Sequence, residues 1–185
     1  MRLFVAVTFP DSIRAAIQSA IDHFPVSDPP WRWAAPENWH LTLKFLGETS
    51  SDRLQPLIAA LDDERLRHHS FDMELGAFGA FPNLRAPRVL FYNVEQGAAE
   101  LERLATGVDH AVRSATGLAL ESRRFHAHAT VARVKDRLAP DVSARLARVP
   151  ALTAPVTRVA GFELVESRLQ RTGAVYSTVK EFALP

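Results

Sequence analysis

Two short motifs of the same composition lie in the two halves of the chain. The first reads His40-Leu-Thr42-Leu and the second reads His128-Ala-Thr130-Val, with nearly half of the 185 residues between them. Each motif lies in an apolar run that is typical of a β-strand. Because side chains alternate between the two faces of a strand, the histidine and threonine of each motif face the same side. We therefore expect two strands that each present an imidazole and a hydroxyl to a shared cleft.

Two imidazoles and two hydroxyls suit displacement at phosphorus. A base must deprotonate the attacking oxygen and an acid must protonate the leaving oxygen. Histidine serves in both roles because its ordinary pKa, about 6.5, leaves both protonation states accessible at neutral pH. Each role contributes on the order of 10²–10⁴-fold to the rate. Threonine hydroxyls can donate hydrogen bonds to phosphoryl oxygens as their charge develops.

Less specific interpretations of these residues stay open. A single His-x-Thr arises by chance, and a histidine in a strand is often purely structural. His126 has the same strand parity as His128 and forms a His-x-His pair with it. Such a pair is a possible metal site, but no third ligand accompanies it at a sensible spacing. We expect no metal and no cofactor.

One further residue follows each motif at the same spacing. Arg133 lies five residues after His128, and strict alternation places it on the opposite face of the strand. A β-bulge would return it to the cleft, where a guanidinium can clamp a phosphate. Phe45 holds the equivalent position after His40. It can stack on a nucleobase, although a core position is the commoner outcome for phenylalanine.

Composition excludes several classes of protein. The 22 basic and 21 acidic residues leave a net charge of +1, far less basic than a protein that coats duplex DNA. The chain has no cysteine, which excludes disulfides, thiol nucleophiles, cysteine zinc sites and iron–sulfur clusters. No apolar run reaches 18 residues, so we expect no membrane segment. A cytoplasmic location is the default expectation.

Hydrophobic periodicity predicts an α+β protein that forms a single domain over residues 1–185. Four helices are expected, the first from about residue 11, the second around 54–61, and the others over 98–115 and 140–148. Loops are expected over 25–30 and 76–87. Strands are expected over 3–9, 31–33, 40–47, 71–75, 88–94, 119–121, 127–134, 156–165 and 174–182.

The two motifs and their surroundings resemble the signature motifs of a known superfamily. Segments 33–47 and 125–133 are similar to the two signatures of the 2H phosphoesterases, and most similar to those of the LigT-like RNA 2′,3′-cyclic phosphodiesterases, also called 2′-5′ RNA ligases. The likeness extends to segments 2–6, 76–84 and 164–169. Ala127 and Ala129 depart from the pattern, which usually has proline and a larger aliphatic residue there. We expect these departures to alter packing and to leave the chemistry intact.

The resemblance implies a fold of two pseudo-symmetric lobes, each an antiparallel sheet backed by helices, with a central cleft. It implies that His40 and His128 are the catalytic pair. Thr42, Thr130 and Arg133 would hold the phosphate. Phe45 stays a possible base-stacking residue.

The resemblance also implies a reaction and a class of substrate. The substrate would be an RNA end or a nucleotide that carries a 2′,3′-cyclic phosphate, and the product a 2′-phosphate. By resemblance His128 would activate water and His40 would protonate the leaving 3′-oxygen, but the residues alone do not separate the two roles. Two alternatives stay open, namely a non-catalytic RNA-end or nucleotide-binding module and a phosphodiesterase or ligase acting on 2′-5′-linked oligonucleotides. No protein partner is implied, and a monomer is expected.

Overall fold

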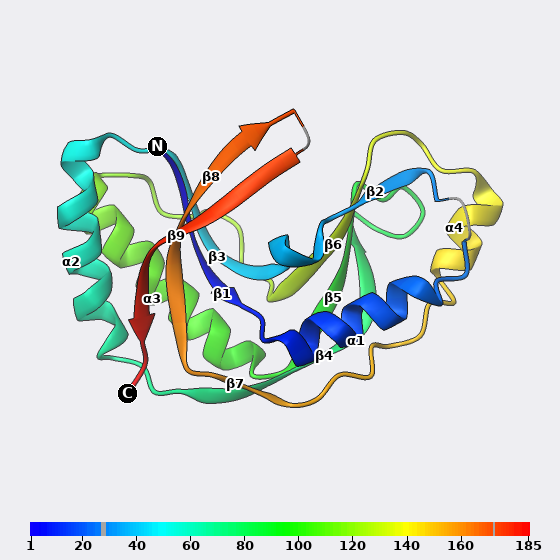
Figure 1. Cartoon of the computed structure of the whole chain (residues 1–185), viewed down its shortest axis with the longest axis horizontal. Helices are drawn as coiled ribbons and strands as arrows, with labels where there is room; N and C mark the ends of the chain where they lie inside the picture. Colours follow the sequence, from blue (N-terminus) through cyan, green and yellow to red (C-terminus); the bar gives the residue numbers. More distant parts are fainter. Residues whose placement is uncertain (27–28, 172) are drawn as a thin grey trace.

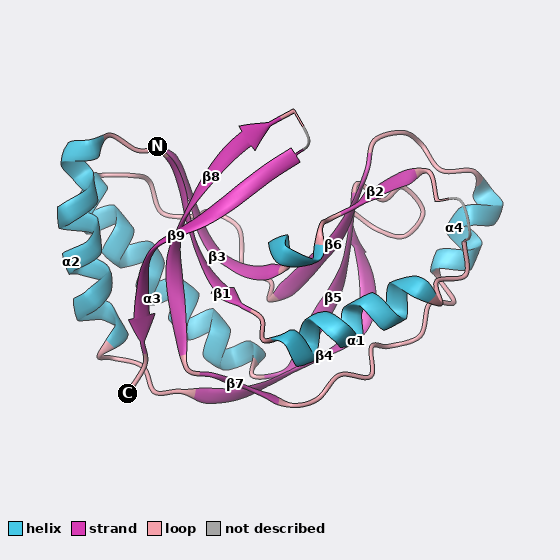
Figure 2. Ribbon diagram, in the orientation of Figure 1, coloured by secondary structure: helices cyan, strands magenta, loops and turns pink. Residues whose placement is uncertain are grey.

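The computed structural model describes residues 1–26, 29–171 and 173–185. Ser27 and Asp28, within the loop expected over 25–30, lie outside the described residues. Four helices and nine strands alternate along the described chain (Figures 1 and 2). The helices are α1 (Asp11–Asp22), α2 (Leu54–Arg65), α3 (Ala98–Thr116) and α4 (Pro140–Leu146). The strands are β1 (Arg2–Thr8), β2 (Trp31–Trp33), β3 (His40–Glu48), β4 (Phe71–Phe81), β5 (Val89–Gln96), β6 (His128–Val134), β7 (Thr157–Val159), β8 (Gly161–Gln170) and β9 (Gly173–Ala183).

All nine strands belong to one antiparallel sheet that curls into two lobes. Its order is β7-β4-β5-β6-β3-β1-β8-β9, and β2 lies off this path and pairs with the last three residues of β6, from Ala132 to Val134. The first lobe contains β3, β1, β8 and β9, with α2 and α3 beside it (Figure 1). The second contains β6, β5, β4 and β7, with α1 and α4 beside it. The α+β fold of two pseudo-symmetric lobes is therefore confirmed.

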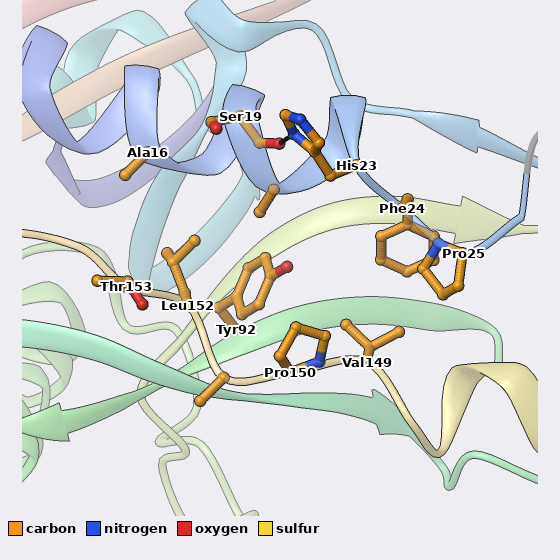
Figure 3. Close-up of a pocket in the computed structure, with 12 residues that line it drawn as sticks. Ala16, Ser19, His23, Phe24, Pro25, Tyr92, Val149, Pro150, Leu152 and Thr153 are labelled. Atoms are coloured by element: carbon orange, nitrogen blue, oxygen red, sulfur yellow. Dashed lines mark hydrogen bonds between the residues drawn. The ribbon is translucent and has the colours of Figure 1, made fainter.

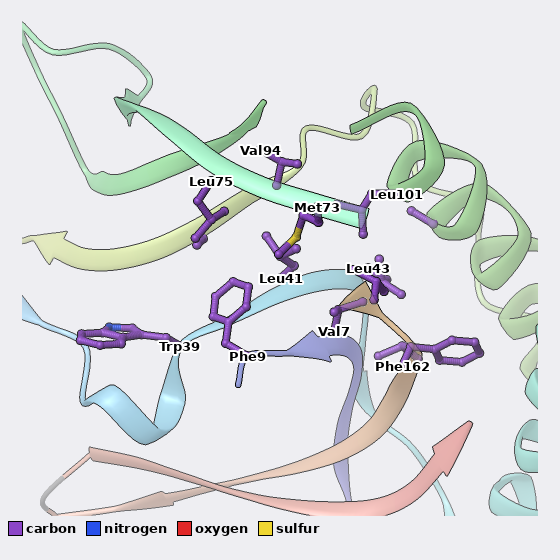
Figure 4. Close-up of a cluster of buried hydrophobic side chains, with 14 of the residues drawn as sticks. Val7, Phe9, Trp39, Leu41, Leu43, Met73, Leu75, Val94, Leu101 and Phe162 are labelled. Atoms are coloured by element: carbon purple, nitrogen blue, oxygen red, sulfur yellow. The ribbon is translucent and has the colours of Figure 1, made fainter. Parts of the chain in front are cut away.

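One continuous apolar core lies on the side of the sheet that the helices cover. Strand β1 contributes Leu3, Val5 and Val7 to this core, and α1 contributes Ile13 and Ile17. Figure 4 shows side chains from both lobes meeting there, among them Leu41 and Leu43 of β3, Leu75 of β4 and Phe162 of β8. Because the core is shared, the lobes hold a fixed position relative to one another.

Helix α3 ends where the sequence predicted a left-handed residue. Gly117 has φ of +75°, and its N–H donates to the carbonyl of Arg113 at 2.8 Å. A side chain is strained in that conformation, so glycine ends the helix at least cost.

None of the helices within residues 1–26, 29–171 and 173–185 combines the length and the apolar character that a transmembrane span requires.

Several predicted boundaries were wrong. The segment predicted as a loop over 76–87 begins inside β4, which continues to Phe81 because its backbone pairs with β5, with Phe78 opposite Tyr92. The strand predicted over 119–121 is absent from the described chain, since the N–H of Glu121 bonds a side chain instead of another strand. The strand predicted over 156–165 divides into β7 and β8, which pair with different neighbours.

A buried ion pair attaches β3 to α3. Lys44 Nζ lies 2.7 Å from Asp109 Oδ1, and the two side chains are 7% and 15% exposed. Lys44 Nζ also donates to the carbonyl of Ala119, and Asp109 Oδ2 accepts from the N–H of Glu121 at 2.8 Å. The pair therefore holds the segment that leads from α3 to β6 and His128.

We expect removal of one partner of this pair to destabilise the protein more than removal of both. Lys44→Met or Asp109→Leu alone leaves an unpaired charge in the interior, at a cost of about 3–5 kcal/mol. The double variant contains no unpaired charge and should recover much of that loss. Urea unfolding of the three variants and the parent measures the free energies. A double variant whose loss equals the sum of the single losses would contradict this account.

Candidate active site

The two motif strands meet where the two lobes join. Strands β3 and β6 are antiparallel and pair directly at Leu41 and Ala129, which are both buried on the core side. Continuing this register places His40 across from Thr130 and Thr42 across from His128. The four side chains are half-buried and lie on the opposite face from the core. The sequence expectation that they share one face is thus met by the strand register.

A β-bulge interrupts each motif strand directly after its threonine. In β3 the consecutive residues Leu43 and Lys44 are both buried, and the register with β1 shifts by one residue there. Phe45 therefore returns to the face of His40, and its side chain is 64% exposed. A core position for this phenylalanine is excluded.

The same irregularity in β6 redirects the arginine. Val131 and Ala132 are both buried, and the register with β5 shifts between Thr130 and Ala132. Arg133 is exposed and lies within electrostatic reach of both His40 and His128. Strict alternation was therefore the wrong expectation for Arg133, and the bulge returns it to the motif face.

Backbone carbonyls fix the orientation of both imidazoles in the same way. Nδ1 of His40 lies 2.7 Å from the carbonyl oxygen of Asn38, and Nδ1 of His128 lies 2.6 Å from that of His126. A carbonyl oxygen only accepts, so each Nδ1 donates its hydrogen. In the neutral ring Nε2 is then the basic atom. Thr42 Oγ1 lies 2.9 Å from Nε2 of His40 and can donate to it.

Aromatic rings enclose His40. The centroid of its imidazole lies 4.9 Å from that of Phe4 on β1 and 5.4 Å from that of Tyr176 on β9. The ring of Phe45 lies next to Phe4, with 6.0 Å between centroids. These contacts pack around the ring of His40 and reduce its exposure to water.

A matching enclosure surrounds His128. Its ring centroid lies 5.0 Å from that of Phe81 on β4 and 5.1 Å from that of Phe91 on β5. His126 packs against the same two phenylalanines, and its Nε2 lies 2.7 Å from Asn93 Oδ1, to which it donates.

Within the described part of the chain, no group of three or more His, Asp or Glu side chains is arranged to hold a metal ion.

The environment lowers the pKa of both catalytic candidates. For each imidazole, burial is the largest cause, because it penalises the charged form. His128 and then Arg133 lower the pKa of His40 further, and His126 and then Arg133 do the same for His128. The hydrogen bonds to the carbonyls of Asn38 and His126 oppose these effects. Since neighbouring cations disfavour a second proton, the pair favours states with no more than one.

Of two cavities beside the sheet in the described part of the chain, one adjoins a motif histidine. A cavity of about 200 Å³ opens beside His40 between β1, β8 and β9. A second cavity of about 350 Å³ lies under α1 on the core side, between Phe24, Tyr92 and Pro150 (Figure 3). Its lining is mostly apolar and includes neither motif, so the cavity beside His40 is the one relevant to chemistry.

Sequence analysis missed the aromatic residues around the histidines. Phe4, Phe81, Phe91 and Tyr176 come from four different strands, none of which carries a motif. Their only signal was strand alternation, which places Phe4 opposite Leu3 and Val5 and therefore away from the core. Which strand lies beside which motif could not be derived from that alternation.

Comparison with known sequences and structures gives a consistent result. A family model described as LigT like Phosphoesterase matches residues 7–91 and 93–176. The chain is 33% identical over 90% of its length to an RNA 2′,3′-cyclic phosphodiesterase from Aeropyrum pernix, covering 92% of that protein. It is 34% identical over 98% of its length to one from Archaeoglobus fulgidus, covering 99%.

Solved structures share the whole fold. A crystal structure of a protein from Thermus thermophilus superposes with a TM-score of 0.81 at 34% identity, covering 100% of this chain and 98% of the other. E. coli LigT in its apo form superposes with a TM-score of 0.78 at 30% identity, covering 99% of this chain and 96% of the other. With the family model matched across both motifs, this chain belongs to the LigT-like phosphoesterases of the 2H superfamily.

Proposed function

We propose that this chain is an RNA 2′,3′-cyclic phosphodiesterase that opens the cyclic phosphate to a 2′-phosphate by histidine acid–base catalysis. The main support is the arrangement of two imidazoles on adjoining antiparallel strands, with each Nδ1 donating to a carbonyl and each Nε2 left for proton transfer. The two curated relatives described above, from Aeropyrum pernix and Archaeoglobus fulgidus, are both named for this activity.

The reaction moves one proton at each histidine. Nε2 of neutral His128 takes a proton from water as the water oxygen attacks phosphorus. The bond from phosphorus to the 3′-oxygen breaks, and protonated His40 donates its Nε2 proton to that oxygen. The products are a 2′-phosphate and a 3′-hydroxyl, and the pair again carries one proton in total. Because one histidine supplies the base and the other the acid, the mechanism requires no metal.

Three side chains are proposed to hold the phosphate. The hydroxyls of Thr42 and Thr130 donate hydrogen bonds to non-bridging oxygens, and the guanidinium of Arg133 neutralises their charge. Thr42 Oγ1 already lies 2.9 Å from Nε2 of His40, so an oxygen bound to it would lie next to the acid. The exposed ring of Phe45 is available to stack on a base of the RNA.

We also propose that the protein acts as a monomer in the cytoplasm and as one domain over residues 1–185. Its two histidines come from both halves of a single chain, so the site needs no partner subunit to supply either. An RNA substrate is consistent with a location inside the cell.

His40→Ala and His128→Ala should each lower kcat for a 2′,3′-cyclic nucleotide by at least about 100-fold, because each removes one proton-transfer group. Thermal unfolding checks that both variants stay folded. His110→Ala, which removes an exposed imidazole on α3, is the matched control and should retain full activity. Identification of the product as the 2′-phosphate, with activity unchanged by EDTA, completes the test. Near-normal turnover by either motif variant would refute the acid–base pair.

The lowered pKa values predict an acidic optimum for the free enzyme. The productive form carries one proton on the pair, and it is populated between the two macroscopic pKa values, which lie below the ordinary value of about 6.5. At higher pH the pair loses its acid. The profile of kcat/KM should therefore peak below pH 6.5 and decline above it. A bound phosphate anion raises both pKa values, so kcat should peak at a higher pH. A peak of kcat/KM at pH 8 would contradict this account.

Arg133→Gln should change both affinity and pH dependence. Loss of the guanidinium should raise KM about tenfold or more, since it removes a charged contact to the phosphate. The same loss removes a cause that lowers both imidazole pKa values, so the peak of kcat/KM should move to higher pH. Arg137→Gln, an exposed arginine just beyond β6, is the control and should change neither property. An unchanged profile for Arg133→Gln would show that its charge does not act on the histidines.

A further inference from the structure

The cavity beside His40 has the features of a small binding site. It lies between β1, β8 and β9 and measures about 200 Å³. Sites for drug-sized ligands usually measure about 300–1,000 Å³, so this smaller cavity suits a ligand group no larger than one planar, fused ring system. His40 lines it directly, and so does Tyr176, whose ring packs edge to face against that of His40 at 5.4 Å between centroids.

The floor of the cavity is apolar. Phe4, Ala6 and Val165 form a small buried cluster on the cleft side of the sheet, separate from the main core, and Tyr176 packs against it. The rings of Phe4 and Tyr176 meet edge to face at 5.0 Å. Aromatic and apolar side chains of this kind contact the faces of nucleobases without regard to their identity.

One carboxylate in the cavity is held in a fixed position. Thr8 Oγ1 donates to Oε1 of Glu163 at 2.6 Å, and Thr178 Oγ1 donates to Oε2 at 2.6 Å. All three residues line the cavity. Each carboxylate oxygen has two lone-pair positions, so each can accept a second hydrogen bond from a ligand. The Glu163 carboxylate is thus held in place as a bidentate hydrogen-bond acceptor.

Arg14 and Glu37 are the other charged residues of the cavity lining. Arg14 Nε donates to the carbonyl of Phe9 at 2.9 Å and its Nη1 lies 3.5 Å from that of Pro36, so these two carbonyls hold the guanidinium in place. Glu37 adds a second, exposed carboxylate at the rim. A ligand with N–H donors on one edge is therefore the chemistry that fits.

The direction of the proposed reaction indicates which nucleoside of the substrate lies next to the cavity. In that reaction His40 protonates the leaving 3′-oxygen, so the ribose carrying the cyclic phosphate lies on the side of His40. Water approaches from the side of His128, where Phe81 and Phe91 close around the ring. The base attached to that ribose is therefore the one that reaches the cavity.

We propose that this cavity is the subsite for the terminal nucleobase and that Glu163 selects guanine, an inference that rests on the proposed function. Guanine presents its N1–H and 2-amino group side by side, which matches the two oxygens of the carboxylate. Adenine and cytosine offer one amino group next to a ring acceptor. Uracil offers one N–H between two carbonyl groups, which a carboxylate repels.

The test compares kcat/KM for the 2′,3′-cyclic phosphates of guanosine, inosine, adenosine, cytidine and uridine. The variants are Glu163→Gln, which keeps the shape and removes the charge, and Glu181→Gln. Glu181, outside the cavity lining, is the exposed cross-strand neighbour of Glu163 on β9 and undergoes the same change of charge. Thermal unfolding checks that both variants are folded.

The parent should prefer guanosine over uridine by about tenfold or more, since a hydrogen bond to a charged group is worth about that much. Inosine, which lacks the 2-amino group, should fall between them. In Glu163→Gln the guanosine-to-uridine ratio should drop at least about tenfold. In Glu181→Gln the ratio should equal that of the parent.

Equal rates for all five substrates in the parent, or an equal loss for all of them in Glu163→Gln, would overturn the assignment while leaving the phosphodiesterase intact. If the parent hydrolyses none of them, the proposed function fails, and calorimetry with guanosine and uridine 2′-monophosphates still tests the subsite. Tighter binding of the guanosine ligand by about tenfold or more supports it. Equal affinities overturn it.

Discussion

The single antiparallel contact between β3 and β6 sets the geometry of the whole site. These strands pair directly at Leu41 and Ala129, and both side chains point into the core that the two lobes share. Since the pairing register fixes which residues lie opposite, His40 and His128 fall on adjoining strands and on the same face. A shift of one residue in either strand would turn its histidine into the core. Burial of Leu41 and Ala129 therefore holds the catalytic candidates in place.

The immediate surroundings then prepare the two imidazoles for opposite roles. Carbonyls of Asn38 and His126 each accept a hydrogen bond from Nδ1, so that Nε2 is the ring nitrogen of each histidine that is left to transfer the proton. Aromatic neighbours reduce the contact of both rings with water, and burial together with Arg133 lowers both pKa values. A bound phosphate anion reverses part of that effect, so the acid gains its proton most readily when substrate is present. Two like bases thereby become one acid and one base.

Local patterns predicted the parts of the site that depend on one strand. Alternation placed each threonine on the same face as its histidine, and the spacing identified Phe45 and Arg133 as equivalent positions after the two motifs. The bulges that return these two residues to the motif face left no signal in composition, because they arise from pairing with β1 and β5. For the same reason Glu163 passed unnoticed, since its role depends on Thr8 and Thr178 from two neighbouring strands.

A crystal structure with a guanosine–vanadate complex tests the central claim most directly, because vanadate adopts the five-coordinate geometry of the transition state at phosphorus. We expect one vanadate bound between the motifs, with Nε2 of His40 and Nε2 of His128 each about 2.6–3.2 Å from a different vanadate oxygen on opposite sides of the metal centre. A vanadate in contact with only one of the two imidazoles, or bound elsewhere in the protein, would contradict the account.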